Sequence, residues 1–428
     1  MTSGSVPLPW RRVLAVVALA LAVRLLYVFS MVLLYGTEQA SDFYFMDQLA
    51  RSLAAGQGYT LAGERIFNQS VGYPAVLAAL YWIFGSRVEV ALGLNAVLGA
   101  LTAGLVYLLA LRILREVPPR LAWLKPERVA LLAAGLMAVY PDSLMYASLL
   151  ASENLLIPLL VASFLSAFWA TRNEWLAGAV TGALAAGAAS AKAQVLFAFL
   201  LVPLIWRAAR FRMVQRTVAA TVGAALVLAP WTYLNYRDSG GYFVPFAAIA
   251  GEVFHDGTNP KARGTTSNVY SLEPEVEAGH NKIEIDRMKF ARAIGYIKAD
   301  PVWYLKLELM KLARSVSPIR DFMFEEAGKY RLYLPWLSRW LPTAFNLMLG
   351  IGLIAGCVAL WRIPLARATA VSLVVGMITV QLVFIGYSRY RFPYLVVLLP
   401  FIAVGLMVVA RWLTGRLGNR VPVGTVQV

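Results

Sequence analysis

Acidic and basic side chains occur at positions in this sequence that suit proton transfer and phosphate binding. Asp42 follows the first apolar stretch in the run Ser41-Asp42-Phe43-Tyr44, before a short helical pattern and the turn Gly56-Gln57-Gly58-Tyr59. A carboxylate just beyond a membrane crossing can act as a general base at the membrane surface. It can equally cap the helix that begins there, and the spacing alone fits both roles. Asp47, one turn further on, is interpreted as a solvated charge on the helix face.

Glu153 is the second acidic candidate. It interrupts apolar residues on both sides in Ala151-Ser152-Glu153-Asn154. A carboxylate at membrane depth is costly and usually functional, which favours a role in chemistry for Glu153. Asp142, in Tyr140-Pro141-Asp142, is interpreted as a helix cap. Both acids are expected near the outer ends of two successive spans, on the same side as Asp42.

Four basic residues form the third group. Arg389 and Arg391 lie in the connection before the last apolar run, Arg65 in the first external loop, and Lys192 between two short apolar halves. Positive charge outside opposes the usual orientation signal, so another reason is needed, and pairing with phosphate supplies one. Lys192 fits a snorkelling contact with lipid headgroups equally well. We predict all four as phosphate-binding residues.

The composition indicates what kind of chain holds these residues. It has 428 residues, of which 60% are hydrophobic and 14% charged, and this excludes a soluble globular protein. The formal charge of +16 does not indicate nucleic acid as a partner, because the basic residues cluster in short loops between apolar runs. One cysteine, Cys357, and two histidines leave no intrachain disulfide and no histidine-rich metal centre.

Apolar runs of about 20 residues, each long enough to cross a membrane as a helix, recur along most of the sequence. We expect about ten spans, at 13–35, 89–113, 129–149, 154–171, 175–190, 193–206, 215–234, 340–361, 368–387 and 393–413. The stretch from Gly72 to Gly85 is shorter and suits an interfacial or re-entrant helix. The basic short loops then all fall on one side, which predicts that both termini are cytoplasmic. Arg24, in the middle of the first span, must face the bundle interior.

The predicted protein is therefore an all-α polytopic membrane protein in three parts. These are an N-terminal transmembrane module (1–234) with an external loop (36–88), an extracytoplasmic segment (235–338), and C-terminal transmembrane helices (339–428). More than half of the 23 acidic residues lie in the second part. Its residues from about 283 to 316 read as two helices, the second capped by Asp300 and lying along the membrane surface.

Together these pieces resemble the GT-C superfamily of integral-membrane glycosyltransferases, in particular the bacterial branch of aminoarabinose transferases and protein O-mannosyltransferase relatives. The motifs that carry the resemblance follow the family's order along most of the chain: Asp42 with Leu49-Ala50, Leu53, Gly56 and Gly58-Tyr59; Gly72-Tyr73-Pro74 to Phe84-Gly85; Pro230-Trp231, Asn235-Tyr236, Gly240, Gly251 and Asn259-Pro260; Asp300-Pro301, Tyr304-Leu305 and Lys311; and Arg389-Tyr390-Arg391-Phe392-Pro393. One departure is Ser70-Val71, which stands where the family has two prolines.

The resemblance implies an inverting glycosyltransferase of the bacterial cytoplasmic membrane. Such an enzyme takes a sugar from a polyprenyl-phosphate donor and transfers it to a lipid, glycan or protein acceptor at the extracytoplasmic face, among membrane lipids. Asp42 would be the general base, and Glu153 would position the acceptor or, in some members, hold a divalent cation with Asp42. The basic residues would hold the donor phosphate. Further candidates for lining the substrate pocket are Asp142, Tyr59, Tyr73, His255 and Asp256.

Two other classes of protein are alternatives. A transporter or lipid flippase is expected to show paired broken helices or an internal repeat, and we find neither in the sequence. A polymerase or ligase of surface polysaccharide with another mechanism would be recognised by the chain length of its products.

Overall fold

The computed structural model describes residues 10–115, 121–267, 274–319 and 335–418 of the chain, and the described part is almost entirely helical. The elements are α1 (Trp10–Tyr35), α2 (Ser41–Ala54), β1 (Thr60–Leu61), β2 (Glu64–Arg65), α3 (Gly72–Phe84), α4 (Val88–Ile113), α5 (Pro126–Ala138), α6 (Pro141–Ala147), α7 (Glu153–Ala167), α8 (Glu174–Ala191), η2 (Ala193–Val195), α9 (Leu196–Phe199), α10 (Val202–Ala208), α11 (Met213–Asp238), α12 (Ala250–Asp256), α13 (Pro274–Glu277), α14 (Lys282–Ala299), α15 (Pro301–Val316), α16 (Pro335–Leu360), α17 (Pro364–Val383) and α18 (Ser388–Gly418). The strands β1 and β2 form a small antiparallel hairpin in the loop between α2 and α3.

The described residues contain six helices long and apolar enough to cross a membrane, which are α1, α4, α11, α16, α17 and α18. A seventh is counted if α5 and α6, which meet at a bend of 49°, form one broken span. The other expected spans are shorter: α7 has 15 residues, α8 has 18, and the run 193–206 is divided among η2, α9 and α10. The all-α polytopic class is confirmed, with six or seven long spans where about ten were expected.

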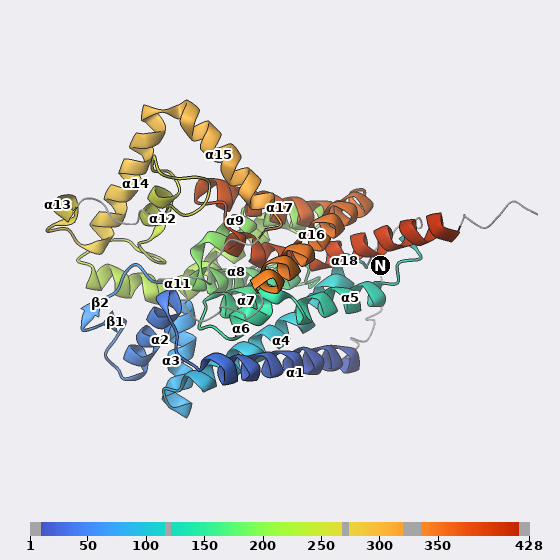
Figure 1. Cartoon of the computed structure of the whole chain (residues 1–428), viewed down its shortest axis with the longest axis horizontal. Helices are drawn as coiled ribbons and strands as arrows, with labels where there is room; N and C mark the ends of the chain where they lie inside the picture. Colours follow the sequence, from blue (N-terminus) through green and yellow to red (C-terminus); the bar gives the residue numbers. More distant parts are fainter. Residues whose placement is uncertain (1–9, 116–120, 268–273, 320–334, 419–428) are drawn as a thin grey trace, which may run out of the picture.

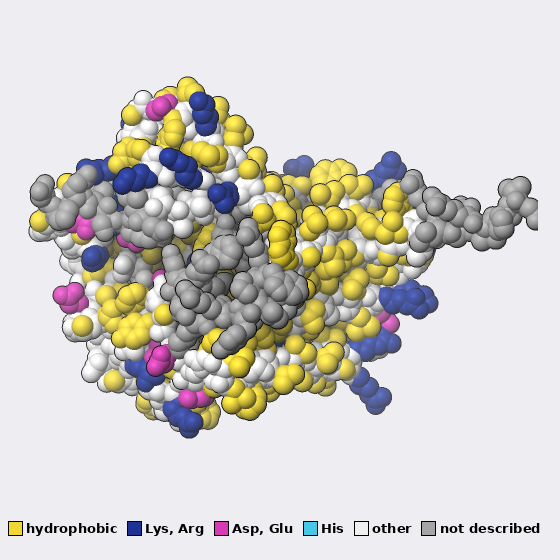
Figure 2. Space-filling model, in the orientation of Figure 1, with side chains coloured by type: hydrophobic (Ala, Val, Ile, Leu, Met, Phe, Trp, Pro, Cys, Tyr) yellow, Lys and Arg dark blue, Asp and Glu magenta, His cyan; other side chains and the backbone are white. Residues whose placement is uncertain are grey.

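The distribution of side chains matches a membrane-embedded body. Hydrophobic side chains cover much of the face drawn in Figure 2, and Lys and Arg lie towards both of its ends, where α18 finishes and over α12 to α15. In Figure 1, α1 begins where α18 ends, whereas α2, α3 and the β1–β2 hairpin lie at the opposite end. The start of the first described helix and the end of the last therefore lie at the same end of the molecule.

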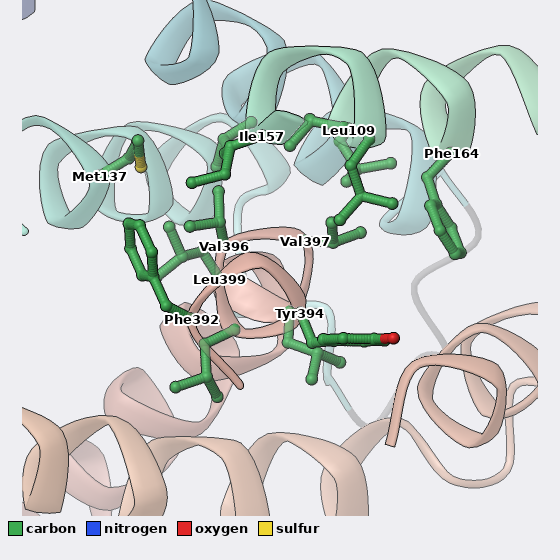
Figure 3. Packing of buried hydrophobic residues seen from close by; sticks show 14 of the residues in the cluster. Leu109, Met137, Ile157, Phe164, Phe392, Tyr394, Val396, Val397 and Leu399 are labelled. Carbon is green, nitrogen blue, oxygen red and sulfur yellow. The ribbon is translucent and has the colours of Figure 1, made fainter. Parts of the chain in front are cut away.

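Helix α18 runs through the centre of the molecule. Its first half is buried almost continuously and packs against α4, α5, α7, α16 and α17. Figure 3 shows Phe392, Val396 and Leu399 of α18 among Leu109, Met137 and Ile157 from the surrounding helices. The C-terminal helices expected from the sequence follow one another along the chain. In space, however, α18 packs among helices of the N-terminal module. Any side chain at the start of α18 is held by this core.

Two helix pairs approach so closely that only glycine fits at the contact. A Cβ atom added to Gly182 of α8 would meet the backbone of Ala220 on α11, and one added to Gly356 of α16 would meet the backbone of Phe401 on α18. Gly178 and Gly352 lie four residues earlier in each helix, so each pair has the small-residue spacing that lets membrane helices touch.

Arg24 faces the bundle interior, as predicted, and the structure identifies its partners. The fully buried guanidinium donates to the carbonyls of Met137 (3.0 Å) and Ala138 (3.4 Å) and to the Ser143 hydroxyl (2.9 Å). The two carbonyls belong to the end of α5, where the bend leaves them without helical partners. Arg24 therefore has a structural role, because it donates hydrogen bonds to carbonyls that the bend between α5 and α6 leaves unpaired within the helix.

The segment between α11 and α16 contains the two helices expected from its sequence, α14 and α15. Asp300 caps α15 by accepting from the Trp303 amide at 2.8 Å, with Pro301 at the first helical position. The apolar side chains Leu305, Leu309 and Val316 are all exposed. An exposed apolar stripe on a helix with polar neighbours suits a position along a membrane surface. Figure 1 shows α14 and α15 as a hairpin projecting beside α12.

The glycine contact between α16 and α18 gives a matched test of the packing. We expect Gly356→Ala to lower the midpoint of thermal unfolding in detergent, because its methyl group meets backbone that cannot move alone. Gly350→Ala, on the same helix, places its methyl group in open space and is expected to be neutral or to stabilise by up to ~1 kcal/mol through helix propensity. Equal midpoints for the two variants would show that the close approach is absent.

Candidate active site

The beginnings of three helices meet at one buried guanidinium. Asp42 is in the first turn of α2, Glu153 is the first residue of α7, and Arg389 is the second residue of α18. Arg389 donates through Nη2 to Glu153 Oε2 (3.1 Å) and through Nη1 to Asp42 Oδ2 (3.2 Å), and its Nε donates to Glu153 Oε1. All three nitrogens thus face carboxylates, and one cation joins segments 347 residues apart in sequence.

Lys192 completes this group from the C-terminal cap of α8. Its Nζ lies 2.8 Å from Glu153 Oε1 and 5.5 Å from the centre of the Tyr390 ring. Burial, with the nearby charge of Arg389, lowers the pKa of Lys192 to about 8. One of the three ammonium protons is used by Glu153, and the side chain keeps 19% of its surface exposed. Lys192 can therefore still donate to a ligand.

The two carboxylates differ sharply in their exposure. The Glu153 side chain is fully buried between two cations, whereas the Asp42 side chain is 52% exposed. The residue at the cap position of α2 is Ala40, and no side chain bonds to the free amides there. The capping role considered for Asp42 is therefore not seen, and its carboxylate is available to a ligand on its exposed side. Asp142 does not cap α6 either, since Tyr140 occupies that position without a side-chain bond.

A cavity of about 960 Å³ opens beside this group. Asp42, Lys192 and Arg389 all line it. Other parts of its wall come from the loop before α3, from α12, from the end of α15 and from the connection between α17 and α18. Of the residues expected from the sequence to act together, Asp42, Lys192 and Arg389 are thus brought to one cavity. Glu153 does not line it but contacts both Lys192 and Arg389.

Two of the predicted phosphate-binding residues have other surroundings. Arg391 donates to the carbonyls of Ser315 (3.2 Å) and Ser317 and is not among the residues that line the cavity. Arg65 Nε lies 3.2 Å from Asp238 Oδ2, and the guanidinium carbon lies 4.9 Å from the centre of the Trp231 ring. These contacts join the loop between α2 and α3 to α11. In the structure both arginines hold segments of the protein together.

Of the five residues predicted to line the substrate pocket, one lines the cavity and four do not. Asp256 lines the cavity, where its carboxylate accepts from the Ser267 amide at 2.9 Å. Tyr73 is buried and donates to Asn95 at 2.7 Å. The three others lie in the protein interior, outside the cavity lining: Tyr59, Asp142 and His255.

The interpretation of Asp47 as a solvated charge is wrong. Asp47 is buried, accepts from Tyr81 at 2.6 Å and pairs with Arg51 at 2.7 Å. These contacts fasten α2 to α3, so Asp47 fixes the helix that carries Asp42. The spacing of residues within α2 could not predict this burial, because the partner, Tyr81, belongs to another helix.

Among the cavity-lining residues that were not predicted from the sequence, three bear on the proposals below. Arg314, near the end of α15, is exposed and has no ion-pair partner within the described residues. The pattern of α15 marked it only as a polar residue beside an apolar stripe. Asn68 and Gln69 lie in the loop before α3 and carry no charge that would have drawn notice.

The position between the two predicted metal ligands is occupied. The Arg389 guanidinium bonds to both Asp42 and Glu153, so as arranged the two carboxylates offer a divalent cation no shared position. Within the described part of the chain, no group of three acidic, histidine or cysteine side chains gathers at one point.

Comparison with known proteins gives a likeness in solved structures only. No family model and no curated protein matches the sequence. The fold is similar to that of ArnT from Cupriavidus metallidurans bound to undecaprenyl phosphate, with 15% identity, coverage of 95% of this chain and 81% of that chain, and a TM-score of 0.44. The apo state of ArnT gives 15% identity, 95% and 80% coverage, and a TM-score of 0.42.

The buried carboxylate gives the first prediction for this site. We expect Glu153→Gln to destabilise the protein by about 3 kcal/mol or more, because Arg389 and Lys192 would lose a shared counter-charge in a buried place. Asp42→Asn removes a half-exposed carboxylate and is expected to cost less than about 1 kcal/mol. Thermal unfolding of both variants in the same detergent measures the difference. An unfolding midpoint for Glu153→Gln equal to that of the wild type would contradict the buried pairing.

Proposed function

We propose that this protein is a membrane glycosyltransferase that moves a sugar from a polyprenyl-phosphate donor to a hydroxyl acceptor, with inversion at the anomeric carbon. One observation carries the proposal. A half-exposed carboxylate, Asp42, is held by a buried arginine at the wall of a large cavity that other cations also line. This arrangement provides a base and positive charge in one place, as transfer from a phosphate leaving group requires.

Asp42 has the role of general base. The acceptor oxygen attacks the anomeric carbon while its proton passes to the Asp42 carboxylate, and the bond from that carbon to the phosphate oxygen breaks. Because a carboxylate is a weak base at neutral pH, proton transfer accompanies bond breaking. Arg389 contacts Asp42 and Glu153 with all three nitrogens, so we assign it to positioning Asp42.

The departing phosphate needs positive charge more than it needs a proton. Lys192 lines the cavity and keeps donors that Glu153 does not use. Arg314 lines the same cavity without an ion-pair partner in the described residues, and its planar guanidinium suits phosphate. We therefore place the donor phosphate with Lys192 and Arg314. The apolar stripe of α15 beside Arg314 suits the polyprenyl chain. Because α15 belongs to the segment expected to be extracytoplasmic, we place the reaction at that face.

Loss of the base is the test of this proposal. Purified protein in lipid nanodiscs is incubated with a panel of undecaprenyl-phosphate sugars and membrane extracts, and mass spectrometry identifies which acceptor gains a sugar. We expect Asp42→Asn to lower the rate at least about 100-fold, the usual contribution of a positioned base, while the unfolding midpoint stays close to that of the wild type. Glu64→Gln, an exposed acid in the same external loop, is the control and should transfer normally.

Transfer by Asp42→Asn at a rate near that of the wild type would refute the role of Asp42. Movement of the lipid-linked sugar across sealed vesicles, without covalent product from the wild-type protein, would instead indicate the transporter alternative.

A further inference from the structure

The cavity wall contains two adjacent carboxamide side chains whose hydrogen-bonding groups are unused. Asn68 and Gln69 line the cavity from the loop before α3, and both are half-buried. Within the described residues neither side-chain amide makes a hydrogen bond. Each carboxamide offers two donor protons and an acceptor oxygen. Two adjacent residues therefore present both kinds of group to whatever fills the cavity.

The backbone on either side of this pair is fixed. The Phe67 carbonyl accepts from the Ala248 amide at 2.7 Å, and the Ser70 carbonyl accepts from the buried Tyr59 hydroxyl at 2.9 Å. These bonds hold the residues immediately before Asn68 and immediately after Gln69. A side chain on a fixed backbone loses less freedom when it binds a ligand, so the pair is organised in advance for recognition.

The basic side chains of the cavity either pair with carboxylates or are assigned to the donor phosphate. Arg389 contacts Asp42 and Glu153, and Lys192 and Arg314 are the two cations placed with the phosphate in the proposed function. Asn68 and Gln69 carry no charge with which to attract phosphate. A carboxamide matches a neutral ligand rich in hydroxyl groups, because each hydroxyl also both donates and accepts a hydrogen bond.

We propose that Asn68 and Gln69 form a hydroxyl-recognition subsite that reads the sugar in this cavity and sets which sugar is accepted. The inference rests on the proposed function and adds to it the residues that determine sugar specificity. The hydroxyl groups can belong to the donor sugar or to a sugar acceptor, and these two sources are distinguished by the choice of probe.

Equilibrium binding to the full-length protein in nanodiscs tests the subsite. The probes are undecaprenyl phosphate alone, undecaprenyl phosphate carrying glucose, mannose, galactose or arabinose, and the methyl glycosides of the same sugars. We expect Asn68→Ala and Gln69→Ala each to weaken binding of one sugar-bearing probe by about 3- to 10-fold, the loss of one or two hydrogen bonds. Binding of undecaprenyl phosphate alone should stay within about twofold of the wild type, since the phosphate contacts remain.

The control variant is Gln57→Ala, which removes an exposed glutamine of the same loop that does not line the cavity. It should leave binding of every probe unchanged. A loss confined to lipid-linked sugars assigns the subsite to the donor, and a loss confined to methyl glycosides assigns it to the acceptor.

Equal weakening of undecaprenyl phosphate with and without its sugar would overturn the inference, because the residues would then shape the cavity as a whole. So would unchanged binding of every sugar probe by both variants, or no binding of any sugar probe by the wild-type protein. Wild-type binding of methyl glycosides that both variants weaken, without binding of any polyprenyl lipid, would support the subsite and refute the proposed donor. The two proposals therefore fail in different ways.

Discussion

The bonds from Arg389 to Asp42 and Glu153 are the interaction on which the site depends. Removing a guanidinium from water costs several kcal/mol, so a buried arginine needs hydrogen-bond acceptors, charged or neutral, for most of its nitrogens. The chain supplies them from the first turns of α2 and α7, where the helix dipole also favours negative charge. Each of the three helix starts is thereby fixed by the other two. As a consequence, the Asp42 carboxylate remains half-exposed and lines a cavity.

The same rule governs the charged groups elsewhere in the apolar body. Arg24 donates through Nη1 and Nη2 to carbonyls at the bend between α5 and α6. Arg216 pairs with Glu174 and donates to the carbonyls of Ala167 and Trp169. Neither of these arginines lines the cavity. What distinguishes Arg389 is therefore its position at the edge of the core, where α18 begins and water can reach one partner. Burial of a charged side chain alone therefore does not identify a functional site. At Arg389 the buried guanidinium also pairs with a half-exposed carboxylate at a cavity wall, and this pairing supports the proposed role.

The sequence predicted the helical class, the long spans and the meeting of Asp42, Lys192 and Arg389, because charge sidedness places these residues on one face. It predicted less well where two helices had to be known together. Asp47 looked solvated until Tyr81 of α3 was placed against it, and Arg391 and Arg65 looked like phosphate ligands until their carbonyl and aromatic neighbours were known. Asn68 and Gln69 carried no signal at all, since an uncharged side chain in a loop becomes informative only when a cavity is seen beside it. The close helix contacts do have a signal in the sequence, because each contact contains a pair of glycines four residues apart.

The most direct test of this account is the accessibility of position 42. Because Cys357 is the only cysteine, a Cys357→Ser background allows Asp42→Cys to be labelled alone with a membrane-impermeant maleimide. The account predicts labelling from the extracytoplasmic side of intact cells, slowed when undecaprenyl phosphate fills the cavity of the purified protein. Labelling only from the cytoplasmic face of inverted vesicles, or at a rate that the lipid does not change, would contradict it.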